Sequence, residues 1–159
     1  MTRLLIALAL VGSLFLAAVT GAAASPLASA SGTFTTTSAT FTSARSAGGN
    51  TVIDLTSTIT YTGTFTGTSV VHGILIFHAN GSANFHDFET FTRTVNGVPG
   101  TVTFNDSGGG DLAAGAYQGT AVIISGTGGL ANLRGVMRQV GTVPDPAKGP
   151  LGTYTAELH

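Results

Sequence analysis

The sequence predicts an all-β protein, an eight-stranded antiparallel up-and-down barrel that follows a cleaved signal peptide. No stretch of helical length has apolar residues at helical spacing, whereas apolar and polar residues alternate repeatedly. Thr, Val, Ile and Phe, which favour strands, recur between turn signals, and 23 glycines punctuate the chain. The chain has no cysteine, so core burial and backbone hydrogen bonds must hold the fold. A closed barrel suits this requirement because it leaves no strand edge unpaired.

Residues 1–24 have the layout of a secretory signal peptide. Arg3 precedes an apolar stretch from Leu4 to Val19, and Ala22 and Ala24 form a small-residue cleavage site. The apolar stretch is about 16 residues long, shorter than the ~20 that a membrane-spanning helix needs. We therefore expect cleavage after Ala24 and secretion to the extracellular or cell-envelope space, with no membrane association after cleavage.

The mature chain is expected to form one barrel domain, residues 32–159, after a flexible lead-in at residues 25–31 that is rich in small, polar residues. Its second strand shows the alternation best, since Ile59 and Tyr61 share one face and Thr58 and Thr60 the other. Longer loops are expected at residues 107–115 and 143–150. The eight expected strands are Gly32–Ser43, Thr51–Phe65, Ser69–His78, Ala83–Val95, Val98–Asn105, Ala116–Ile124, Gly135–Gly141 and Gly152–Leu158.

Two dipeptides, Asn80-Gly81 and Asn96-Gly97, predict two-residue hairpin turns, because both residue types tolerate the positive φ of a type I′ turn. A two-residue loop also fixes the strand register. The first turn would place His72 opposite Glu89, and the second would place Glu89 opposite Phe104. Both turns assign the same face of the strand 83–95 to the interior. That face carries Phe85, Asp87, Glu89, Phe91, Arg93 and Val95.

Three segments resemble a known group of proteins. Residues 82–92 (SANFHDFETFT) resemble the central strand of bacterial domains of unknown function that have an allene oxide cyclase-like barrel, and residues 96–104 resemble their next hairpin. The Gly-rich segment 125–135 is similar to a turn that this group shares with allene oxide cyclases and dirigent proteins. The resemblance implies an eight-stranded barrel of calycin type over nearly all of the mature chain.

The resemblance brings no settled activity with it. Asp87 and Arg93 stand where the bacterial group usually has a small residue, and Pro99 stands where a basic residue is common. No catalytic residue of the cyclases is carried over to this chain.

His72, Asp87 and Glu89 form the candidate catalytic site. In the predicted register the Cβ atoms of His72 and Glu89 lie about 5 Å apart, and Asp87 lies diagonally to His72. An apolar interior raises the pKa of a carboxyl group, and a nearby imidazole can exchange protons near neutral pH, as general acid–base catalysis requires. The competing interpretation is structural: buried charged groups usually satisfy one another.

Three functions remain open. The favoured one is binding of a small apolar or amphipathic molecule, because barrels of this size can enclose one. Glu89 and His72 would orient its polar end, and the pocket wall would consist of Phe85, Phe91, Phe104, Ile74 and Ile76. The second is a cyclase- or isomerase-like, or dirigent-like, enzyme with Glu89 or Asp87 as the base and His72 as the proton partner. The third is a structural barrel without a ligand.

Composition argues against several other partners. Without Arg3 the chain has five basic against seven acidic residues. This balance does not provide the basic surface that binds the phosphate groups of a nucleic acid. His72 and His78 would lie about 20 Å apart along one strand, too far to bind one metal ion, and His72 with the two carboxylates is the weaker alternative. The sequence shows no cofactor-binding loop, so neither a metal nor another cofactor is expected. An outer-membrane barrel would need its apolar face outward, and the resemblance favours the opposite arrangement. Assembly into a homo-oligomer stays open.

Overall fold

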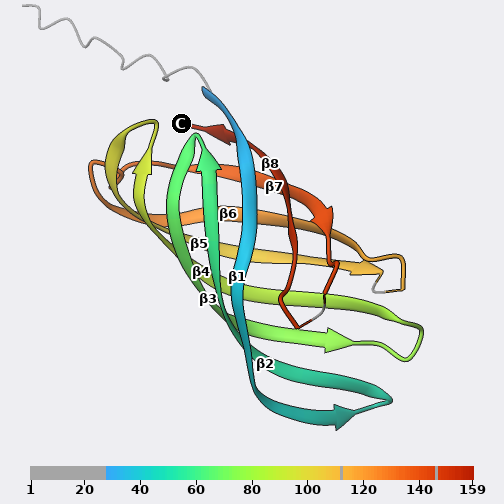
Figure 1. Ribbon diagram of the computed structural model, residues 1–159. Helices are drawn as coiled ribbons and strands as arrows, with labels where there is room; N and C mark the ends of the chain where they lie inside the picture. The colour runs from blue at the N-terminus through green and yellow to red at the C-terminus, as the bar shows by residue number, and fades with distance from the viewer. Residues whose placement is uncertain (1–27, 112, 146) are drawn as a thin grey trace, which may run out of the picture.

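The computed structural model describes residues 28–111, 113–145 and 147–159, which form eight strands (Figure 1). Each strand pairs antiparallel with the next, and β8 pairs with β1, so the strands close into a ring. The eight predicted strands are all present, whereas the predicted signal peptide lies outside the described residues. The strands are β1 (Ala28–Ala47), β2 (Asn50–Gly63), β3 (Phe65–Phe77), β4 (Ser82–Val95), β5 (Val98–Asp111), β6 (Ala116–Gly128), β7 (Gly135–Thr142) and β8 (Leu151–Leu158). Within the described ranges, no helix is long and apolar enough to cross a membrane.

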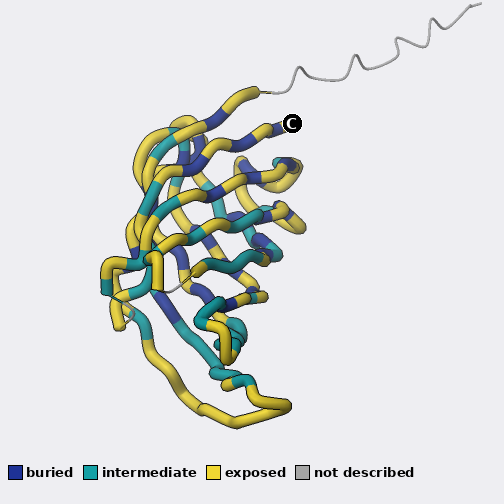
Figure 2. The backbone as a smooth tube through the Cα atoms, turned by 90° about the vertical axis from the view of Figure 1, so that its right-hand side faces the viewer, coloured by how far each residue is buried: buried dark blue, intermediate teal, exposed yellow. Residues whose placement is uncertain are grey.

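Alternation along the strands separates the interior of the ring from its surface (Figure 2). The face predicted to be buried in the second strand is confirmed, because Ile59 and Tyr61 are both buried. Phe65 is buried as well, but it begins β3 instead of ending the second strand. The chain reverses at Gly63, whose φ of 96° is readily adopted only by glycine.

The turn at Asn96-Gly97 is the predicted one. Asn96 and Gly97 have φ values of 50° and 78°, as a type I′ turn requires, and Val95 pairs with Val98. The register then continues along both strands, so that Phe91 pairs with Val102 and Glu89 pairs with Phe104. This part of the predicted interior is confirmed.

The two-residue turn predicted at Asn80-Gly81 is wrong. The loop has three residues, because the His78 N–H donates to the Ser82 carbonyl at 2.9 Å and the Gly81 N–H donates to the His78 carbonyl at 3.0 Å. The extra residue shifts the β3–β4 register by one position, so Val71, not His72, pairs with Glu89. Since the side-chain period of a strand is two, the shift moves every side chain of β3 to the opposite face from the predicted one.

Two other boundaries differ from prediction. Residues 28–31, expected as a flexible lead-in, begin β1 and pair with the end of β8. The predicted loop at residues 107–115 is mostly strand, because β5 runs on to Asp111. Its glycines allow close packing: a Cβ at Gly108 would lie 2.2 Å from the Gln118 carbonyl oxygen and 2.6 Å from the ring of Phe85.

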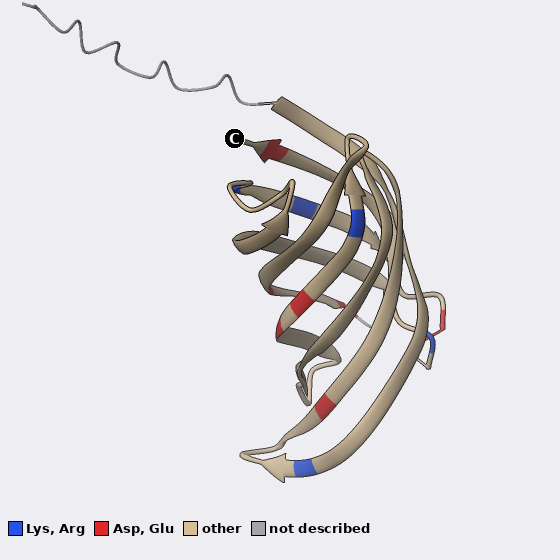
Figure 3. Ribbon diagram, turned by 90° about the vertical axis from the view of Figure 1, so that its left-hand side faces the viewer, with Lys and Arg blue, Asp and Glu red and all other residues tan. Residues whose placement is uncertain are grey.

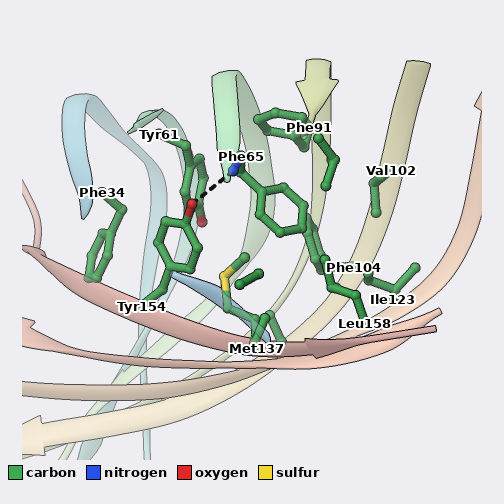
Figure 4. Close-up of a cluster of buried hydrophobic side chains, with 14 of the residues drawn as sticks. Phe34, Tyr61, Phe65, Phe91, Val102, Phe104, Ile123, Met137, Tyr154 and Leu158 are labelled. Carbon is green, nitrogen blue, oxygen red and sulfur yellow. Dashed lines mark hydrogen bonds between the residues drawn. The ribbon is translucent and has the colours of Figure 1, made fainter. Parts of the chain in front are cut away.

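Aromatic side chains fill one end of the ring interior (Figure 4). Phe65 lies at their centre, with ring centroids 5.3 Å from Phe91 and 5.7 Å from Tyr154. The Tyr154 hydroxyl accepts a hydrogen bond from the Phe65 N–H at 2.8 Å and donates one to the Thr62 carbonyl at 3.0 Å. It therefore ties β8 to the turn between β2 and β3, where the chain reverses.

Replacing Tyr154 by Phe tests this tie. The Y154F variant leaves the buried N–H of Phe65 without its acceptor, so we expect the free energy of unfolding to fall by about 1–3 kcal/mol. Urea denaturation measures the change. The matched control, Thr155→Val, removes an exposed hydroxyl from the same strand and should change stability by less than about 0.5 kcal/mol. Equal stability of Y154F and T155V would contradict the structural role of the hydroxyl.

Candidate functional site: a cavity with a buried carboxyl cluster

A cavity of about 110 Å³ occupies the end of the ring interior that the aromatic residues leave unfilled. Apolar side chains from several strands form most of its wall, including Leu55, Val71, Leu75, Phe77 and Phe85. Its inner end, next to the aromatic core, is polar and includes Asp87, Glu89, Asp106 and Gln139. The cavity thus combines an apolar wall with an acidic inner end.

Three carboxyl groups form the acidic inner end. Asp87 and Glu89 are successive inward residues of β4, and Asp106 of β5 pairs directly with Asp87. The three residues are only 6%, 1% and 5% exposed, respectively. Charged residues are few along the strands (Figure 3), so a cluster of three buried acidic side chains stands out from the rest of the chain.

A chain of hydrogen bonds crosses the interior and ends at Glu89. The Tyr117 hydroxyl donates to Gln139 Oε1 at 2.7 Å, and Gln139 Nε2 donates to the Tyr61 hydroxyl at 3.0 Å. The Tyr61 hydroxyl donates in turn to Glu89 Oε2 at 3.1 Å. Every donor in the chain points towards Glu89, an arrangement that stabilises a negative charge on its carboxyl group.

Burial shifts the proton affinity of all three carboxyl groups upward. Loss of hydration and then the charge of Glu89 raise the pKa of Asp87 to about 7 and that of Asp106 to about 11. Loss of hydration also raises the pKa of Glu89, although its hydrogen bonds act in the opposite direction. Asp106 is therefore protonated at neutral pH, while Asp87 titrates there.

The same physical cause keeps both tyrosines of the hydrogen-bond chain protonated. Burial, followed by the charges of the neighbouring carboxyl groups, raises the pKa of Tyr61 and Tyr117 well above 10. Both hydroxyl groups therefore act as hydrogen-bond donors over the whole physiological range.

One oxygen of each carboxyl group lacks a donor. Asp87 Oδ1, Glu89 Oε1, Asp106 Oδ1 and the neighbouring Ser69 Oγ are buried and have no hydrogen-bond partner of good geometry among the described residues, although Ser69 and Asp106 lie close enough to Glu89 to lower its pKa. A protonated Asp106 can donate its single proton to only one neighbouring oxygen at a time. Unmet acceptors are costly in a protein interior, so their presence beside a cavity indicates a place for an incoming donor.

The structure separates the predicted site residues into three groups. Asp87, Glu89 and Phe85 line the cavity. Phe91 and Phe104 point inward as predicted but belong to the filled aromatic end, so they do not line the cavity. His72, Ile74 and Ile76, whose inward position depended on the wrong turn, are not among the cavity-lining residues.

His72 in particular is not part of the site. It is exposed on the outer face of the ring, where its Nδ1 lies 3.2 Å from the Thr56 hydroxyl. Arg93, predicted to point inward, is exposed too. Its φ of 136° is one that L side chains rarely adopt, although β4 continues through it and pairs Arg93 with Gly67 and Gly100.

Three residues of the site, Asp106, Tyr117 and Gln139, were not predicted from the sequence. Asp106 shares its face of β5 with Val102 and Phe104, but the predicted strand ended one residue before it. Tyr117 and Gln139 occupy inward positions of β6 and β7, two strands whose registers the predicted turns did not reach. Extending the alternation by one residue past Asn105 would have found Asp106.

No set of three or more His, Asp or Glu side chains in the part of the chain that the structure describes is arranged to hold a metal ion.

The fold and the site define a class of small all-β proteins, in which a closed ring of antiparallel strands surrounds a cavity with an acidic inner end. The family described as "Protein of unknown function (DUF3224)" matches residues 30–143, and the chain belongs to this family. No curated protein matches the sequence.

A solved structure supports the fold. The chain is similar to a protein of unknown function from the DUF3224 family of Shewanella oneidensis MR-1, with a TM-score of 0.67 and 19% sequence identity. The similarity covers 84% of this chain and 97% of that one. At this level of identity the similarity establishes the shared fold.

Proposed function

We propose that the protein binds a small amphipathic molecule in the cavity. One observation carries the proposal: an apolar-walled cavity of about 110 Å³ ends at buried carboxyl oxygens that lack donors. Ligand sites commonly combine apolar walls with a few convergent polar groups. For scale, an engineered apolar cavity of about 150 Å³ accommodates benzene.

The aromatic pair Phe85 and Tyr117 gives the wall a flat, rigid surface. Their rings stack at a centroid distance of 5.5 Å and an interplanar angle of 10°. Both residues line the cavity, and the glycines beneath Phe85 leave room for this position. An apolar ligand body would lie against this wall while its polar end faces Asp87 and Glu89.

A panel of six-carbon compounds tests the proposal. We expect at least one of hexan-1-ol, hexylamine and hexanoate to bind saturably, with NMR shifts confined to the residues that line the cavity. In the variant Ala39→Phe, a larger side chain enters the cavity wall and should weaken binding at least about tenfold. Thr40→Phe is the matched control, because neighbouring residues of a strand point to opposite faces and Thr40 is exposed. The proposal fails if no compound binds, or if A39F and T40F bind alike.

A second candidate function is proton transfer of the cyclase or isomerase type. It is supported by Asp87, with a pKa of about 7, facing a protonated Asp106 inside the same cavity, which together supply a base and an acid. Mass spectrometry of compounds extracted from the native protein tests it. A captured compound that is converted by the wild type but not by Asp87→Asn would support catalysis, whereas unchanged recovery from both would leave binding as the function.

We also propose export and an allene oxide cyclase-like barrel for this chain. Export is supported by the basic, apolar and small-residue order of residues 1–24. The barrel type is supported by the segments 82–92, 96–104 and 125–135 that resemble that group. Fractionation of a producing cell, followed by N-terminal sequencing of the exported protein, should find a chain that begins at Ser25.

A further inference from the structure

Three of the buried atoms without a partner are carboxyl oxygens at the inner end of the cavity. Asp87 Oδ1, Glu89 Oε1 and Asp106 Oδ1 each belong to a side chain that is more than nine-tenths buried, and each borders the same cavity. Asp87 and Asp106 are directly paired across β4 and β5, which places their Cβ atoms about 5 Å apart. Three acceptors this close together can share one small group that carries several N–H donors.

The charge of the cluster is not balanced by the cavity wall. Among the described residues that line the cavity there is no Lys, Arg or His. Lys148 neighbours the lining residue Gly149, but its side chain is 79% exposed and lies 3.5 Å from Asp145. A negative charge buried without a partner is destabilising, so the cluster favours a cationic ligand over a neutral or anionic one.

The other titratable groups around the cluster do not change this conclusion. Tyr61 from β2 and Tyr117 from β6 face it, and both stay protonated and neutral because burial raises their pKa. The lining residues from β1, β3 and β7 carry no titratable group, and β8 contributes none to the wall. The ionisation of the inner end therefore depends on Asp87, Glu89 and Asp106.

We propose that the cavity binds a primary amine with a short apolar body. Its ammonium group would donate N–H bonds to the unmet oxygens of Asp87 and Glu89, and the protonated Asp106 would accept the third through its carbonyl oxygen. The apolar body would lie against Leu75, Phe77 and Phe85. This inference rests on the proposed function, because it specifies the kind of molecule that the cavity takes.

Calorimetric titration of the wild-type protein with three ligands of equal chain length tests the inference. At pH 8 we expect hexylamine to bind at least about tenfold tighter than hexan-1-ol, and hexanoate to bind most weakly. Between pH 6 and pH 8 the affinity for hexylamine should rise about tenfold, since Asp87 ionises with a pKa of about 7 while the amine stays protonated. The affinity for hexan-1-ol should change less than that for hexylamine, because the alcohol carries no charge.

Two variants locate the effect at the cluster. Asp87→Asn should remove the pH dependence and weaken hexylamine binding at least about tenfold, and it should weaken hexan-1-ol binding by a smaller factor because the alcohol carries no charge. Glu89→Gln provides a second, independent loss of charge, and Glu157→Gln removes an exposed carboxyl group from β8 as the control.

If hexylamine and hexan-1-ol bind equally and A39F weakens both, the amine inference is overturned and the proposed function stands. If none of the three ligands binds, both are overturned.

Discussion

Raising the pH from 5 to 8 is expected to destabilise this protein. The pKa of Asp87 is raised to about 7 and that of Asp106 to about 11, whereas aspartate in an unfolded chain titrates near 4. Between these values the folded state holds more protons than the unfolded state, so stability is greatest at low pH and falls as the pH rises. Each carboxyl group contributes a slope of roughly 1.4 kcal/mol per pH unit, up to pH 7 for Asp87 and beyond pH 8 for Asp106.

Denaturant titrations at pH 5, 6, 7 and 8 measure this slope. Asp106→Asn replaces the protonated carboxyl group by a neutral amide of the same shape, so its slope should be smaller and its stability at pH 8 higher than that of the wild type. Glu157→Gln, which changes an exposed carboxyl group, should keep the wild-type slope. A wild-type protein whose stability stays level or rises over this pH range would show that the carboxyl groups are not desolvated.

Truncating Phe65 is expected to cause a large loss of stability from the aromatic core. Phe65 is fully buried and packs against Tyr61, Phe91, Phe104 and Tyr154. Phe65→Ala should lower the free energy of unfolding by about 3–5 kcal/mol, because it removes apolar contacts and leaves a void.

Phe88→Ala is the matched control for this truncation. Phe88 lies on the outer face of β4 and is 50% exposed, so its removal should cost less than about 1 kcal/mol. Urea denaturation of both variants at one pH gives the comparison. Similar losses for the two phenylalanines would mean that the aromatic end is not a close-packed core.

The sequence was sufficient to predict the strands but not every register. Alternation and turn residues located all eight strands, because both depend only on neighbouring residues. Asn96-Gly97 also gave the correct pairing of β4 with β5, and with it the inward position of Asp87 and Glu89. These two residues are the part of the site that local patterns could establish.

The rest of the site depended on a choice between turns that the local residues do not determine. Asn80-Gly81 is compatible with a two-residue turn and with the three-residue loop that the structure contains, and the difference of one residue decides whether His72 or Val71 faces inward. Asp106 became visible only with the true length of β5. Tyr117 and Gln139 join the cluster through closure of the ring, which brings β6 and β7 round to face β2.

The filled aromatic end determines how a ligand can enter and leave the interior of the ring. Because Phe65, Phe91 and Tyr154 fill that end, the described part of the ring is closed at its aromatic end and is not a tube open at both ends. A ligand in the cavity would therefore enter and leave past the apolar wall and not through the aromatic end. Substitutions at the mouth should therefore alter the rates of entry and exit together, while the closed base keeps the strands in place.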